Sequence, residues 1–266
     1  MSKVDQLFAE LSQQSQTAFM PFVTAGDPDL EFTEQLLTAL NNAGCHLIEL
    51  GFPYSDPIAD GPVIQESYTR ALQNGIAVDQ IFEMTSRVRP NLNSPLVAMV
   101  SYALIFRYGL EAFVDTALAA GISGAIVPDL PVDESGTFAK LCTEKDFSLV
   151  QLITPTTSDE RATEIANTSS GFIYYVSVAG ITGERTSLPP ELTERLNWLK
   201  SQTKTPICVG FGISQSDQAR MLKDHADGII VGSAIIKRIA SLATGPKESA
   251  VREIASYAAE MTAALK

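Results

Sequence analysis

The feature that most constrains this fold is a regular alternation between short apolar runs and longer amphipathic segments. The short runs are rich in β-branched and aromatic residues, and Gly, Pro, Asp or Asn marks the switches between segments. Short apolar runs predict strands, longer periodic segments predict helices, and their alternation is typical of parallel α/β folds. The predicted strands are residues 18–24, 46–50, 96–100, 124–127, 148–153, 172–176, 207–210 and 228–231.

Amphipathic segments fill the intervals between these strands, and most of them begin beside Pro, Asp or Ser, as helices do. Eight strands fit a closed (β/α)8 TIM barrel with an extra N-terminal helix and an extra helix after the second strand. A doubly wound open sheet uses the same alternation and stays open as the alternative. The predicted helices are residues 4–14, 30–42, 63–74, 78–88, 110–120, 133–144, 159–166, 190–201, 215–223 and 248–265.

The length of the chain suits one barrel of this kind. It has 266 residues, of which 45% are hydrophobic and 19% charged, and no linker rich in Gly, Ser or Pro divides it. We therefore expect residues 1–266 to form a single TIM-barrel domain. The first residues are polar without an apolar targeting segment, and no apolar stretch could span a bilayer, so we expect a soluble, cytoplasmic protein.

Charge and composition exclude several classes of function. A formal charge of −12 argues against a nucleic-acid or anionic-membrane partner, although backbone N–H groups can still hold an anionic metabolite. Cys45, Cys142 and Cys208 are far apart and flanked by apolar residues, which favours buried thiols over disulfides. Since only His46 and His225 could add imidazole ligands, we expect no catalytic metal.

Glycine-rich loops follow the last three predicted strands. Their sequences are AGITG at 179–183, GFGIS at 210–214 and VGSA at 231–234. In barrels of this kind the loops after the strands build the site, and glycines there let backbone N–H groups approach an anion. A single motif is explained equally well by a turn. Together and in this order, the motifs predict a phosphate site.

The loop after the second strand carries a second cluster of polar residues. Glu49 ends an otherwise apolar strand and shares a strand face with Leu47. A buried carboxyl group has a raised pKa, which suits a proton donor and acceptor near neutral pH. A hydrogen-bonded strand-end Glu is the equally open structural interpretation. For Asp56 and Asp60, turn formation beside proline stays open as well.

The same loop resembles the signature segment of tryptophan synthase alpha subunits. The segment is residues 49–65, ELGFPYSDPIADGPVIQ, and further matches are PFVTAGDP at 21–28, PDLP at 128–131, GITG at 180–183 and the two late glycine loops. These matches follow the family order and cover essentially the whole chain. The resemblance implies a retro-aldol lyase that splits indole-3-glycerol phosphate into indole and glyceraldehyde 3-phosphate, with no cofactor and no metal.

The resemblance also implies roles for individual residues. Glu49 would shuttle the protons, while Asp60 would accept a hydrogen bond from the indole N–H and stabilise positive charge on the ring. The implied substrate-binding residues are Phe22, Val100, Tyr175 and Thr182, and the implied phosphate-binding residues are Gly183, Gly212, Gly232 and Ser233. Val100 stands where the family often has leucine, and Thr182 and Gly183 would belong to a loop that closes over the substrate.

The implied partner is the tryptophan synthase beta subunit, a pyridoxal-phosphate enzyme, in an alpha2-beta2 complex. Residues 52–60 are the expected docking element. One departure is Val178 after Ser177, where many bacterial members have Arg, so a stand-alone lyase stays open. A weakly active barrel that only activates its partner is a further alternative, against which the presence of both Glu49 and Asp60 argues. An isomerase of a phosphorylated sugar derivative would share the late loops but not the segment 49–65.

Overall fold

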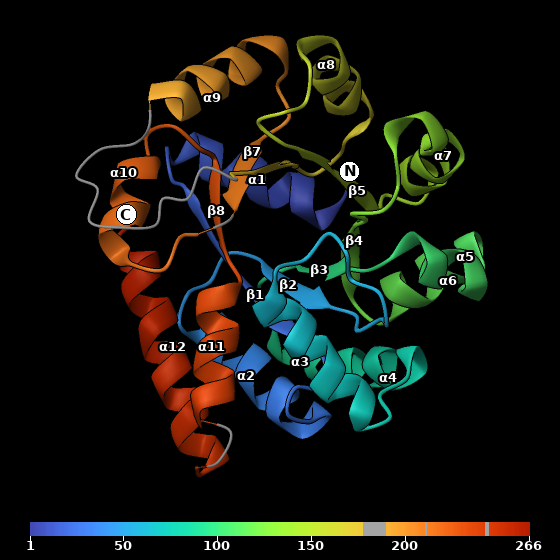
Figure 1. Ribbon diagram of the computed structural model, residues 1–266, viewed down its shortest axis with the longest axis vertical. Coiled ribbons are helices and arrows are strands. Elements are labelled where there is room, and N and C mark those ends of the chain that lie inside the picture. The colour runs from blue at the N-terminus through green and yellow to red at the C-terminus, as the bar shows by residue number, and fades with distance from the viewer. Residues whose placement is uncertain (178–189, 211, 243–244) are drawn as a thin grey trace.

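The strands of this protein close into a parallel barrel in sequence order. The computed structural model describes residues 1–177, 190–210, 212–242 and 245–266. Within these ranges eight strands form the barrel, and it closes where β1 pairs with β8 through Ala18 and Gly228 (Figure 1). The predicted TIM barrel is confirmed, and the closure excludes the open sheet. The strands are β1 (Ala18–Thr24), β2 (Ile48–Gly51), β3 (Leu96–Met99), β4 (Ile122–Ile126), β5 (Ser148–Ile153), β6 (Ile173–Val176), β7 (Ile207–Gly210) and β8 (Gly228–Val231).

A ring of helices surrounds the barrel (Figure 1). The extra helix before β1 and the extra helix α4 after β2 are both present, as predicted. The predicted helix 133–144 is divided into a 3-10 turn, η2 (Val132–Glu134), and α7. The helices are α1 (Lys3–Gln13), α2 (Leu30–Asn42), α3 (Pro62–Gln73), α4 (Val78–Val88), α5 (Tyr102–Tyr108), α6 (Leu110–Ala119), α7 (Gly136–Glu144), α8 (Asp159–Thr168), α9 (Pro190–Gln202), α10 (Ser216–Leu222), α11 (Ser233–Leu242) and α12 (Lys247–Ala263).

Two helices, α5 and α11, were not predicted. The α5 helix has seven residues, too few for a helical period to show, and it depends on its caps: the Ser101 hydroxyl accepts from Ala103 N at 3.2 Å and Asp129 accepts from Tyr102 N at 2.7 Å. The α11 helix begins two residues after β8, and its first turn, SAII, largely continues the apolar run of the strand. Periodicity does not separate a short strand from the helix that directly follows it.

The N-terminal helix α1 covers the end of the barrel where the strands begin. Ser2 shares a hydrogen bond of 2.7 Å with Ser148, the first residue of β5. The carboxylate of Asp5 accepts from Gly171 N, just before β6, at 2.9 Å. The opposite end of the barrel, where the strands finish, is the end at which barrels of this architecture carry their sites.

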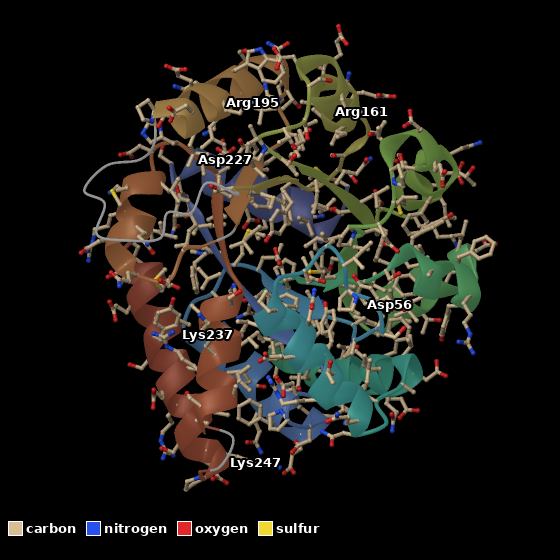
Figure 2. The ribbon with its side chains drawn as sticks, viewed as in Figure 1. Asp56, Arg161, Arg195, Asp227, Lys237 and Lys247 are labelled. Atoms are coloured by element: carbon tan, nitrogen blue, oxygen red, sulfur yellow. The ribbon has the colours of Figure 1, made fainter. Side chains whose placement is uncertain are left out.

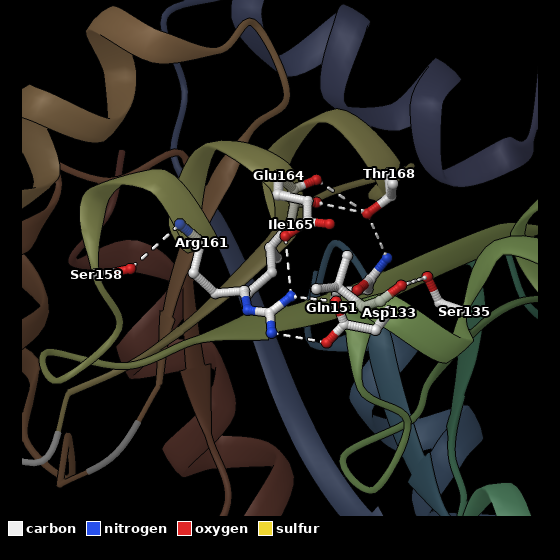
Figure 3. Close-up of polar contacts among 9 residues, drawn as sticks. Asp133, Ser135, Gln151, Ser158, Arg161, Glu164, Ile165 and Thr168 are labelled. Atoms are coloured by element: carbon white, nitrogen blue, oxygen red, sulfur yellow. Dashed lines mark hydrogen bonds and ion pairs between the residues drawn. The ribbon is translucent and has the colours of Figure 1, made fainter.

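Polar contacts also fasten the helices to one another. Arg161 on α8 forms two hydrogen bonds with Asp133 in η2, at 2.7 and 2.9 Å, while Gln151 on the outer face of β5 donates to Thr168 at 2.8 Å (Figure 3). The Arg161 and Asp133 side chains are largely exposed, so we expect their contribution to stability to be small. In the ranges that the structure describes, no helix is both long and apolar enough to cross a membrane.

Candidate active site

A cavity of about 470 Å³ opens at the C-terminal end of the barrel. Residues from β1, β2, β3, β6 and β8 form its floor, and the loops after β2, β7 and β8 form its walls. This is the end at which barrels of this architecture carry their sites. The lining residues are Phe22, Glu49, Asp60, Gly61, Ile64, Met99, Tyr174, Gly212, Ile213, Ser214, Gln215, Ile230, Gly232, Ser233, Ala234, Lys237 and Arg238.

Glu49 lies on the floor of the cavity and has no solvent exposure. It pairs with Phe22 of β1 and Val97 of β3, so its side chain points into the barrel as theirs do. Neither carboxyl oxygen has a hydrogen-bond partner among the described residues. Burial raises the pKa of Glu49 well above its usual value, because the charged form loses its hydration without any compensating contact. Burial without a partner therefore favours the protonated form of this carboxyl group.

Asp60 reaches the cavity from the loop that leads into α3. The loop holds its backbone, since Asp60 N donates to Pro57 O at 3.0 Å and Gln65 Nε2 donates to Asp60 O at 2.8 Å. Its Oδ2 is buried without a partner. Burial raises the pKa of Asp60 to about 6, and a hydrogen bond from the Tyr54 hydroxyl acts in the opposite direction. Near neutral pH this carboxyl group is ionised.

An aromatic group packs beside the two carboxyl groups. The Phe22 and Tyr68 rings are 6.4 Å apart, and the Tyr68 and Tyr54 rings 5.5 Å apart. Gly51 makes this packing possible, because a Cβ there would lie 2.5 Å from the Phe22 ring and 2.9 Å from the Tyr68 hydroxyl. The Tyr68 hydroxyl is buried and has no partner in the described structure. Tyr68 was not predicted as a site residue, because nothing in the sequence pattern of α3 distinguishes it from a core aromatic.

Two of the expected substrate-binding residues differ by one position from the side chains that line the cavity. Met99 and Tyr174 line the cavity, whereas Val100 and Tyr175 are buried and are not among its lining residues. Neighbouring residues of a strand point to opposite faces, so a shift of one position moves a side chain from the barrel interior to the helix side. Tyr174 fits inside because Gly210 lacks a Cβ, which would lie 2.3 Å from the Tyr174 hydroxyl.

The end of the cavity away from β2 is built by the two late glycine loops. Gly212, Gly232 and Ser233 all line it, as expected, and Gly212 has a φ of +81°, which favours glycine. Ser233 is the first residue of α11, so the free N–H groups of that helix begin here. Thr182 and Gly183 lie outside the described residues.

Two basic side chains lie near the start of α11. Lys237 and Arg238, one turn along α11, both line the cavity, and neither was predicted because α11 was not. Lys237 lies on the α11 side of the molecule in Figure 2, away from Asp56 in the loop after β2. Among the described residues, no group of three His, Cys, Asp or Glu side chains could hold a metal ion.

Comparison with known proteins decides the family. The family model for the tryptophan synthase alpha chain matches residues 8–266. This chain belongs to the tryptophan synthase alpha chain family. A relative of that name from Rhodopirellula baltica is 48% identical, with 98% of this chain and 95% of the relative covered. Another, from Picosynechococcus, is 46% identical over 95% of this chain and 96% of the relative.

Solved structures agree with the sequence relatives. The crystal structure of tryptophan synthase subunit alpha from Legionella pneumophila has a TM-score of 0.90 and 33% identity, and the match covers 100% of this chain and 98% of that one. The resemblance drawn from the motifs is thus confirmed over the full chain. As a member of the tryptophan synthase alpha chain family, the protein is a lyase of tryptophan biosynthesis.

This family member has a second cavity at the same end of the barrel, of about 810 Å³. It lies beside the loop after β2 and is lined by parts of that loop, α3, α4 and α5, including Pro53, Asp56, Ile58 and Leu104. Ile58 is 90% exposed, and Phe106 on the neighbouring α5 is 70% exposed. An exposed apolar side chain at the edge of a groove is a feature found in surfaces that contact other proteins.

Proposed function

We propose that this chain cleaves indole-3-glycerol phosphate to indole and glyceraldehyde 3-phosphate, with Glu49 and Asp60 as its catalytic residues. The observation that carries the proposal is the contrast between the two carboxyl groups of one cavity. Glu49 is buried without a partner, which raises its pKa well above the usual value and favours its protonated form, whereas the pKa of Asp60, about 6, leaves that group mostly charged at neutral pH. One site thus offers a proton donor and a fixed negative charge.

The first step uses both groups. The neutral Glu49 carboxyl gives its proton to C3 of the indole ring, and the ring becomes a cation with a double bond between C2 and the ring nitrogen. The Asp60 carboxylate accepts a hydrogen bond from the ring N–H and stabilises this positive charge. Without this protonation the aromatic ring offers no place for the electrons of the C–C bond that must break.

The second step breaks that bond. The Glu49 carboxylate, now charged, takes the proton of the hydroxyl on the side-chain carbon attached to C3, and that carbon becomes an aldehyde. The electron pair of the broken C–C bond forms the C2–C3 double bond, and the C=N π pair returns to the ring nitrogen. Indole leaves, glyceraldehyde 3-phosphate forms, and Glu49 carries a proton again. These two reaction steps need no metal and no organic cofactor.

The lining of the cavity suits the two ends of the substrate. Phe22, Ile64, Met99 and Tyr174 supply apolar and aromatic surface near Glu49, where we propose that the indole ring lies. Gly212 in the loop after β7, and Gly232 and Ser233 at the start of α11, are proposed to bind the phosphate through their backbone N–H groups. The proposed contributions of Thr182 to substrate binding and of Gly183 to phosphate binding complete the site.

A beta subunit is the proposed partner, and the second cavity with Ile58 is the proposed docking surface. The Legionella structure is named subunit alpha, which fits assembly with another subunit. Pro53 and Pro57 stiffen the docking loop and reduce the entropy lost on binding. We further propose that residues 1–266 form one domain, since one buried core runs from Val4 to Leu265, and that the protein works in the cytoplasm.

Glu49→Gln tests the proposal. The amide keeps size and hydrogen-bonding capacity but cannot exchange a proton, so single-turnover indole release should fall by roughly 10²–10⁴-fold. Substrate affinity should change little, and Glu253→Gln, on the exposed face of α12, serves as the matched control. Cleavage by Glu49→Gln within about tenfold of the parent would remove the support for acid–base catalysis by Glu49. Running the assay with and without a pyridoxal-phosphate beta subunit separates a subunit, which the partner activates, from a stand-alone lyase.

A further inference from the structure

Arg238 lines the phosphate end of the cavity, although no phosphate motif contains it. Its side chain runs back along α11, since Nη1 donates to Ala234 O at 2.9 Å. Long helical side chains point towards the N-terminus of their own helix. The guanidinium therefore lies beside the first turn of α11, where Gly232 and Ser233 present the backbone N–H groups.

A second residue fixes this guanidinium. The Arg238 Cζ lies 3.7 Å from the centre of the Tyr257 ring, within the range of a cation–π contact. Tyr257 is on α12, and its hydroxyl donates to Ser214 O at 2.9 Å. Burial raises the pKa of Tyr257 to about 12, so the hydroxyl keeps its proton and remains a donor.

These contacts connect the two loops of the phosphate end. Ser214 follows β7, and Ala234 follows β8; Arg238 and Tyr257 bridge between them. Among the described residues, the one hydrogen bond of the guanidinium goes to Ala234, so its other N–H groups stay available. Lys237 also lines the cavity, but its side chain is exposed and no contact in the described structure holds it.

We propose that Arg238 determines the specificity of this site for a phosphorylated substrate and that Tyr257 is its positioning residue. The guanidinium supplies a fixed positive charge beside the backbone N–H groups, in a molecule whose formal charge is −12. A planar guanidinium matches the oxygens of a phosphate, and its stacking on Tyr257 reduces the freedom lost on binding. This inference rests on the proposed function, because it assumes that the anion bound at this end is the substrate phosphate.

Arg238→Met tests the charge. It keeps a long apolar stem and loses the cation, so the Kd for sn-glycerol 3-phosphate by titration calorimetry, and the KM for indole-3-glycerol phosphate, should both rise about tenfold or more. The kcat at saturation should stay close to that of the parent, and the KM for phosphate-free indole-glycerol should not change. Arg238→Lys should recover only part of the affinity. Arg220→Met, on the exposed α10 helix, removes the same charge outside the cavity and is the matched control.

Tyr257→Leu tests the positioning. It leaves Arg238 in place but removes the ring beneath it, so the affinity for glycerol 3-phosphate should fall in the same direction. The double variant with Arg238→Met should fall little further than Arg238→Met alone, because the two changes act on one contact. Tyr257→Phe, which keeps the ring, should retain most of the affinity.

The results separate the inference from the proposed function. A folded Arg238→Met protein with the Kd of the parent for glycerol 3-phosphate would overturn the inference while cleavage by the parent still supported the function. A lower melting temperature with unchanged affinity would likewise overturn it and leave Arg238 as a structural link between α11 and α12. A parent that does not cleave indole-3-glycerol phosphate would overturn the proposed function itself.

Discussion

Two carboxyl groups of one cavity differ in how their surroundings shift their pKa. Glu49 points into the closed barrel, where no described side chain donates to it, and burial raises its pKa well above the usual value. Asp60 lies at the cavity wall beside the Tyr54 hydroxyl, and its pKa rises only to about 6. The chemistry of each residue is thus decided by its place in the barrel and not by its type.

The pKa of Asp60 predicts a limb in the pH profile. Because the ionised form must stabilise the ring cation, kcat/KM should fall as the pH drops through about 6. The substrate phosphate titrates in a similar range, at about pH 6, so the measurement is made with phosphate-free indole-glycerol as well. Asp60→Asn should be much slower and should lack the limb with that substrate. If the limb persisted in Asp60→Asn, another group would be responsible for it.

The buried Glu49 predicts a dependence of stability on pH. Its pKa is raised in the folded state, so the native protein binds a proton that the unfolded chain has already released above about pH 4.5. Stability from this group is present below that pH and is lost as the pH rises towards the folded pKa. The melting temperature of Glu49→Gln should therefore rise relative to that of the parent as the pH is raised from about 5 to about 8. This range begins just above the ordinary glutamate pKa of 4.5, which applies to the unfolded chain.

Asp60→Asn is the control for that measurement. The pKa of Asp60 in the folded state is about 6. The difference in melting temperature between Asp60→Asn and the parent should therefore stop growing above about pH 6, while the difference between Glu49→Gln and the parent continues to grow. Parallel melting temperatures for Glu49→Gln and the parent over the whole range would show that Glu49 is not held neutral by the fold.

At the scale of the elements, the sequence predicted which strands exist better than where their side chains point. The β-branched runs located all the strands and so the barrel, and the loop after β2 was recognised whole. Val100 and Tyr175 were assigned to the cavity, yet Met99 and Tyr174 line it. The faces alternate from residue to residue, and a fully buried strand has apolar residues on both, so composition does not reveal which face is inside.

At the phosphate end of the cavity, too, the sequence predicted only some of the lining residues. The glycines after β7 and β8 were predictable because close backbone approach requires them. The α11 helix was not, since its apolar first turn follows an apolar strand with little to separate the two. Lys237 and Arg238 were missed with it, and the Arg238 contact with Tyr257 joins helices that only the fold brings together.

Substitution at Gly232 tests the anion site of α11. A Cβ at this position would be 3.6 Å from the Phe22 Cβ, an ordinary contact, so Gly232→Ala should fold and bind phosphate nearly normally. Gly232→Asp places a carboxylate against the phosphate and should weaken substrate binding by at least about a hundredfold, as like charges in contact do. Phosphate-free indole-glycerol should bind both variants alike. Equal affinity of Gly232→Asp and Gly232→Ala for glycerol 3-phosphate would show that the phosphate does not bind beside Gly232.

At the scale of the whole molecule, the two ends of the barrel differ in structure. The α1 helix covers the end where the strands begin. The candidate active-site cavity and the second cavity, beside the loop after β2, lie at the other end. The loop after β2 was recognisable from its sequence, but the groove beside it was not. That groove combines residues 53–59 with parts of α3, α4 and α5, which are distant along the chain. Such a surface exists only after the barrel has closed.

The proposed docking surface can be tested at Ile58, whose side chain is 90% exposed. Leaving an isoleucine in water is unfavourable unless a partner covers it, and apolar anchors of this kind carry much of the energy of an interface. Ile58→Ser should therefore raise the Kd for the beta subunit about tenfold, the equivalent of losing one buried aliphatic side chain, and activation by that subunit should fall with it. Ile58→Val keeps most of the apolar surface and should behave nearly as the parent does. Because Ile58 does not line the substrate cavity, the affinity of the isolated chain for glycerol 3-phosphate should be the same in all three proteins. An Ile58→Ser protein that is activated as fully as the parent, at beta-subunit concentrations near the Kd, would place the interface on another face of the barrel.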